Sequence, residues 1–221
     1  MSVEEAGREL GYFFISIMCI KLSLMAKVKL AEFEKIYATN RADFRKWLEV
    51  NHTSAPGIWL IYYKKHSGKP SISYPEAVKE ALCFGWIDSK VNTIDDERYM
   101  QVFTPRKAKS VWSALNKKYI AELQGQNLMT AAGLKCIEVA KQNSQWESLD
   151  KVEALEIPDD LAIAFDKNKI AKRNFETFPP SSKKVILQWI ASAKREQTRQ
   201  KRIEETVTLA AQNIRANHYG Q

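Results

Sequence analysis

The chain has 221 residues, of which 45% are hydrophobic and 27% charged, proportions typical of soluble globular proteins. They exclude an intrinsically disordered chain, a collagen-like chain and a polytopic membrane protein. The 34 Lys and Arg residues outnumber the 26 Asp and Glu residues, which gives a formal net charge of +8. Three cysteines and three histidines lie far apart in the sequence. We therefore expect no disulfide framework, no metal site and no cofactor.

The N-terminal segment contains an uncharged run of ten residues, Gly11 to Ile20. A membrane-spanning helix needs about 20 apolar residues, so we expect no integral membrane span. Three acids and one base precede the run, whereas a signal peptide should begin with positive charge. The segment could be a weak signal or anchor, a helix packed on the body, or an extension before a native start at Met25. We favour the last interpretation, which makes residues 1–24 an extension and predicts a cytoplasmic protein.

Residues 25–108 are expected to form an α+β module with a small antiparallel sheet. An amphipathic pattern predicts a helix from Asn40 to Glu49, and an aromatic, β-branched run predicts a strand from Gly57 to Lys64. Ser73 is a typical N-cap for a helix that ends at Gly85. Two strands, Trp86 to Ile94 and Tyr99 to Thr104, are expected to form a hairpin.

Residues 109–221 are expected to form an all-α helical bundle, because no strand pattern follows Thr104. The first helix of this region would be capped by Ser110. The further helical patterns cover Thr130–Gln142, Pro158–Lys167, Ile170–Phe178, Ser181–Ala193 and Glu196–Ile214. The fold class predicted for the whole chain is therefore α+β followed by a helical bundle.

Charge alternates along the second half of the chain. Six bases and no acids lie between Arg98 and Lys118, eight acids and two bases lie between Glu138 and Asp166, and seven bases and three acids lie between Lys183 and Glu205. These segments could be solvated helix faces, or the two basic segments could form one surface that binds anions.

An anion site is predicted at the start of the helix capped by Ser110. Amide groups at a helix N-terminus bind anions, basic side chains would surround them, and tryptophans could stack on a planar group. The simpler interpretation is that the tryptophans are core residues and the bases are solvated. The candidate residues for an anionic ligand or polyanion are Trp86, Asp88, Arg98, Arg106, Lys109, Ser110 and Trp112, joined by Arg199 and Arg202.

Two other functions remain open from the sequence. A small cofactor-independent enzyme could use Asp88 and Arg106 on an anionic substrate, and an open basic face could bind nucleic acid. If Asp88 and Arg106 are buried against each other, the segment is scaffold instead. Cys83 is expected to be structural rather than nucleophilic, because the C-terminal end of a helix disfavours a thiolate. No catalytic residue and no oligomeric state can be assigned.

Three motifs point to a family. The sequences CFGWIDS from Cys83, FTPRKAKSVWSALN from Phe103 and AKREQTRQKRIEETV from Ala193 resemble the YdeI/OmpD-associated family, also labelled bacteriocin-protection proteins. The resemblance spans about Ile36 to Gln212. It implies a link to survival against bacteriocins and cationic antimicrobial peptides. It also implies an envelope partner, and a periplasmic location as the alternative to the cytoplasm. The positive net charge opposes capture of cationic peptides unless the acidic segment Glu138–Asp166 carries it out.

Overall fold

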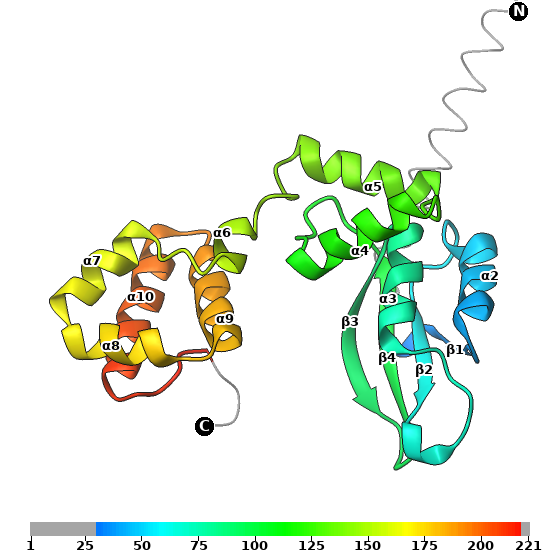
Figure 1. The fold of residues 1–221 in the computed structure, drawn as a ribbon, viewed down its shortest axis with the longest axis horizontal. Helices are drawn as coiled ribbons and strands as arrows, with labels where there is room; N and C mark the ends of the chain where they lie inside the picture. Colours follow the sequence, from blue (N-terminus) through cyan, green and yellow to red (C-terminus); the bar gives the residue numbers. More distant parts are fainter. Residues whose placement is uncertain (1–29, 218–221) are drawn as a thin grey trace, which may run out of the picture. The chain divides into compact units, whose positions relative to one another are not determined.

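The computed structural model describes residues 30–217, so the expected extension 1–24 lies outside the described residues. The chain forms two compact units (Figure 1). The N-terminal unit holds residues 30–110 with Lys118–Val139, and the C-terminal unit holds Val111–Lys117 with residues 140–217. Within the described residues, no helix has both the length and the apolar character needed to cross a membrane.

The N-terminal unit is built on a four-stranded sheet of order β1-β2-β4-β3. The strands are β1 (Glu34–Tyr37), β2 (Ile58–Tyr63), β3 (Trp86–Thr93) and β4 (Arg98–Pro105). The antiparallel pairing of β4 with β2 and β3 agrees with the predicted hairpin and sheet. The edge strand β1 was not predicted, and it runs parallel to β2. Its sequence EKIY is mostly exposed and has no apolar alternation of its own.

A side chain closes the hairpin between β3 and β4. Asp95 Oδ1 accepts hydrogen bonds from the backbone N–H groups of Glu97 at 3.0 Å and Arg98 at 2.7 Å. An aspartate that binds the backbone two or three residues further on stabilises a tight turn. The register of the pair then shifts between Asp88 and Val91, which marks a bulge in β3.

Two helices with strong local start signals pack on this sheet: α2 (Arg41–Asn51) and α3 (Tyr74–Cys83). The Asn40 side chain caps α2, and Ser73 with Glu76 forms a capping box at α3. The apolar face of α2 meets the sheet through ring contacts of Phe44 with Phe103 and of Trp47 with Trp86, with centroids 5.6 and 5.8 Å apart. Short 3-10 turns, Leu30–Glu32 and Lys65–Ser67, complete the α+β module.

Most of α4 (Ala114–Gly125) and of α5 (Ala131–Gln142) also belongs to the N-terminal unit. The sequence places the start of the helical region at residue 109, whereas the structure groups Lys118–Val139 with the sheet. The cause is a tertiary contact, since the N–H and hydroxyl of Thr130 both donate to the Cys83 carbonyl at the end of α3, at 3.1 and 2.7 Å.

The C-terminal unit contains five further helices: α6 (Asp150–Glu153), α7 (Asp159–Lys167), α8 (Lys169–Thr177), α9 (Pro180–Ala191) and α10 (Glu196–Ala211). All but the short α6 were predicted. Asn168 separates α7 from α8 and caps α8 by accepting a hydrogen bond from the Ala171 N–H. The helices enclose an apolar core that includes Leu161, Phe165, Phe175, Ile186, Leu187, Ile190 and Ile203. The fold class, α+β with a helical C-terminal region, is confirmed.

Candidate functional site

The helix that was predicted to be capped by Ser110 begins later in the chain. Helix α4 begins at Ala114, and residues 106–113 form a turn at Ala108 and Lys109 with irregular backbone on either side. The Ser110 hydroxyl accepts a hydrogen bond from the Lys107 N–H at 3.1 Å, so it stabilises a turn rather than capping a helix. The prediction that Ser110 starts a helix was wrong, because a serine side chain binds backbone groups equally well in a turn.

The two tryptophans of the predicted site are core residues. Trp86 is 1% exposed and its indole N–H donates to the His52 carbonyl at 3.1 Å. Trp112 is also buried, and it packs on Trp146 with ring centroids 5.2 Å apart. Because neither indole presents a face to solvent, neither can stack on an incoming base. The simpler of the two sequence interpretations therefore holds for both tryptophans.

The predicted arginines of the N-terminal unit also have partners or lie inside the fold. Arg98 binds Asp95 through Nη2 and Nε, at 2.6 and 2.8 Å, and so holds the hairpin closed. Burial lowers the pKa of Arg106 to about 10, and the nearby Cys136 and Asp88 oppose this shift. Of the nine predicted residues, Lys109 is exposed and the other eight are buried or half-buried.

Asp88 lies in a hydrogen-bonded network at the junction of α3 and the sheet. Its Oδ2 accepts hydrogen bonds from the Tyr74 hydroxyl at 3.0 Å and from Gln101 Nε2 at 2.7 Å. The charge of the half-buried Arg106 lies close enough to interact with it. Both Asp88 and Arg106 are half-buried, and Oδ2 of Asp88 is already occupied by Tyr74 and Gln101.

The two predicted arginines of the C-terminal unit fix α10 to its neighbours. Arg199 forms a two-pronged ion pair with Asp160 on α7, with Nε–Oδ2 and Nη2–Oδ1 distances of 2.5 and 2.9 Å. These hydrogen bonds hold the pKa of the Asp160 carboxyl below its usual range. Arg202 lies over the Trp189 ring at 5.0 Å and donates to the Ser192 hydroxyl at 3.0 Å.

Arg199 also lines a cleft of about 680 Å³, which we call the acidic cleft. Its apolar part consists of Val152, Ile157, Pro158, Leu187 and Ala191, and its charged and polar part of Glu147, Ser148, Lys151, Glu156, Asp159, Asp160 and Arg199. The cleft therefore combines an apolar lining with a charged one.

The charges of the acidic cleft do not cancel. Lys151 pairs with Glu156 at 3.2 Å, and Arg199 pairs with Asp160. Glu147 and Asp159 are exposed, and neither forms an ion pair within residues 30–217. The four acids and two bases leave a formal charge of −2 on the lining.

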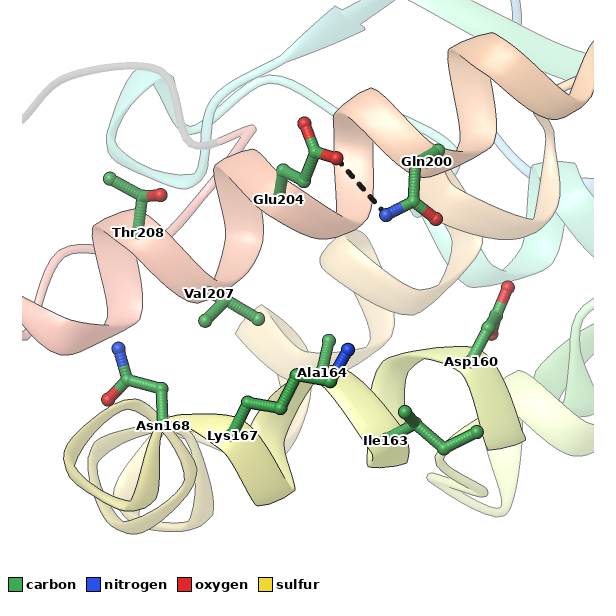
Figure 2. Close-up of a pocket in the computed structure, with 9 residues that line it drawn as sticks. All are labelled: Asp160, Ile163, Ala164, Lys167, Asn168, Gln200, Glu204, Val207 and Thr208. Atoms are coloured by element: carbon green, nitrogen blue, oxygen red, sulfur yellow. Dashed lines mark hydrogen bonds between the residues drawn. The ribbon is translucent and has the colours of Figure 1, made fainter.

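A second hollow of about 490 Å³ lies between α7 and α10 (Figure 2), and we call it the α7–α10 pocket. Ile163 and Ala164 line it from α7 and Val207 from α10. Gln200 Nε2 donates to Glu204 Oε1 at 3.1 Å on its rim. The remaining lining residues are Asp160, Lys167, Asn168 and Thr208. Asp160 lines both this pocket and the acidic cleft.

The acidic cleft was not predicted as a site, although the sequence shows the acidic segment from which it is built. The four acids of the cleft lie within the acidic segment Glu138–Asp166, and Arg199 was predicted for a different, basic surface. Composition alone could not show that these acids come together beside apolar side chains of α6 and α9. Within the described part of the chain, no group of His, Cys, Asp and Glu is arranged to hold a metal ion.

The chain therefore combines an α+β unit with a helical unit that carries an acidic, partly apolar cleft. Residues 154–213 match a family described as Bacteriocin-protection, YdeI or OmpD-Associated, so the resemblance predicted from sequence is confirmed for this segment. Residues 36–136 match a domain of unknown function (DUF8412), and the motifs that begin at Cys83 and Phe103 lie in that segment. No curated protein and no solved structure gives a significant match.

Proposed function

We propose that the C-terminal unit is a binding module for a cationic, amphipathic peptide segment, and that the protein acts in protection against bacteriocins or cationic antimicrobial peptides. The observation that carries the proposal is the acidic cleft, whose net negative lining includes an apolar part. The family matched by residues 154–213 is described by bacteriocin protection, and that segment supplies most of the cleft.

The chemistry of the lining matches such a ligand in two ways. Glu147 and Asp159 offer carboxylates that are not in ion pairs with the described residues, so a lysine or arginine of the ligand can pair with them. Ile157 and Pro158, which are half-buried, and Ala191, which is exposed, offer apolar surface to a neighbouring side chain. The cleft is therefore suited to alternating charged and apolar side chains despite the positive charge of the whole chain.

The other functions weighed from the sequence have less support. An enzyme that uses Asp88 would need a free carboxylate, but Tyr74 and Gln101 already bind its Oδ2. A polyanion site would need a cluster of free cations, but Arg98 and Arg199 pair with aspartates. Cell fractionation can decide between the cytoplasmic location predicted from the N-terminal residues and the periplasmic location that the resemblance implies.

The proposal can be tested by fluorescence anisotropy with a labelled peptide of alternating lysine and leucine. We expect the double variant Glu147→Gln, Asp159→Asn to bind about fivefold more weakly, because each exposed charge pair contributes roughly 0.5 kcal/mol. The loss should shrink at high salt. Glu176→Gln is the matched control, since Glu176 is exposed on α8 and lines neither hollow.

Two outcomes would overturn the proposal. One is that the wild-type protein does not bind the peptide, and the other is that the double variant binds as tightly as Glu176→Gln. Retention on heparin that is lost in Lys109→Ala would support the anion-binding or nucleic-acid-binding face predicted from the sequence instead.

A further inference from the structure

We infer that the acidic cleft and the α7–α10 pocket are two subsites for one ligand, a peptide segment with a cationic half and an apolar half. The inference rests on the proposed function and adds the order of side chains in the ligand. Asp160 lines both hollows, so they adjoin at its side chain. Arg199 binds Asp160 through two hydrogen bonds, so the residue shared by the two hollows is held in place.

The two hollows differ in charge. The acidic cleft has a formal charge of −2, whereas Lys167 balances Glu204 in the α7–α10 pocket once Asp160 is paired with Arg199. The cationic half of the ligand is therefore attracted to the acidic cleft, and the α7–α10 pocket gives no such advantage to a second cation.

The α7–α10 pocket instead offers apolar surface. Ile163 is 58% exposed although it is a large aliphatic residue, and Ala164 and Val207 also line the pocket (Figure 2). Polar side chains, Gln200, Glu204 and Thr208, lie along the α10 side. An apolar surface with a polar rim is typical of a place where a partner buries an aliphatic or aromatic side chain.

The distance between the far ends of the two hollows suits a short peptide segment. Helix α7 has nine residues and is about 13 Å long, and it carries Asp159 of the acidic cleft at one end and Lys167 of the pocket at the other. A peptide of about 8 to 10 residues in extended form covers more than that distance. One ligand can therefore place lysines against Glu147 and Asp159 while its leucines contact Ile163.

The test compares two labelled peptides, one with a lysine half followed by a leucine half and one with the lysine half alone. We expect Ile163→Ser to weaken binding of the two-part peptide about tenfold and to leave binding of the lysine half unchanged. Ile170→Ser is the matched control, because Ile170 is 61% exposed on α8 and lines neither hollow. Both isoleucines are exposed, so both variants should keep the wild-type melting temperature.

The outcomes separate this inference from the proposed function. If Ile163→Ser and Ile170→Ser bind the two-part peptide equally well while the Glu147→Gln, Asp159→Asn variant binds it weakly, the single-ligand inference is wrong and the acidic cleft stands alone. If Ile163→Ser weakens both peptides equally, the α7–α10 pocket is not a separate apolar subsite. If the wild-type protein binds neither peptide, the proposed function fails as well.

Discussion

The buried carboxylate of Glu80 gives the sharpest test of how the N-terminal unit is held together. Glu80 lies on α3 and its side chain is 1% exposed. Its Oε1 accepts a hydrogen bond from Arg41 Nε, and its Oε2 pairs with Arg45 Nη1 at 2.9 Å. Both arginines lie on α2, so this carboxylate ties the two helices to each other. The perturbation is Glu80→Gln, which keeps the shape and removes the charge.

The expected loss of stability depends on how deeply Glu80 and its two arginines are buried. Removing one member of a buried ion pair costs about 3–5 kcal/mol, because the other charge stays in a poorly solvated place. The side chains of Arg41 and Arg45 are 33% and 27% exposed, so water screens part of that loss. We therefore expect Glu80→Gln to lower the free energy of unfolding of the N-terminal unit by about 2–3 kcal/mol.

The assay is hydrogen-exchange mass spectrometry across a urea titration, which reports on peptides of α3 separately from those of the C-terminal unit. Glu122→Gln is the control, because Glu122 pairs with Lys79 at 2.7 Å but is 37% exposed, and its loss should have a much smaller effect. A cost below about 1 kcal/mol for Glu80→Gln would refute the reasoning that this buried carboxylate holds two charges. A cycle with Arg41→Gln should show coupling between the two positions.

Two further predictions concern the packing at the end of α3. In Gly133→Ala the new Cβ would lie 2.3 Å from the Cys83 carbonyl oxygen and 2.7 Å from the Leu82 carbonyl oxygen. We therefore expect the free energy of unfolding to fall by about 1–3 kcal/mol. Thermal melting should show no such loss for the control Gly125→Ala, where the Cβ meets open space. Burial raises the pKa of the Cys83 thiol to about 11. Peptide mapping should therefore find Cys83 unmodified by iodoacetamide at pH 8 until urea unfolds the protein. Alkylation of the folded protein at the rate of a free thiol would contradict the buried position.

Local patterns predicted the elements whose signals lie within a few residues. Asn40 and Ser73 start α2 and α3 as expected, because an N-cap satisfies amide groups of its own first turn. The hairpin around Asp95 was also predicted, since its turn depends on neighbouring backbone groups. Ser110 shows the limit of such signals, because the same hydroxyl chemistry stabilises a turn.

The α+β order, the helices of the C-terminal unit and the family resemblance of residues 154–213 could all be predicted from local patterns. The place of β1 in the sheet could not be predicted in this way, since its exposed residues pair with a strand formed elsewhere in the chain. Tertiary structure also paired Arg199 with Asp160 across 39 residues of sequence, which placed a residue predicted for a basic surface at the edge of an acidic cleft. The physical reason is that periodicity and caps depend on near neighbours, whereas the partner of a charge and the lining of a cleft depend on which distant segments pack together.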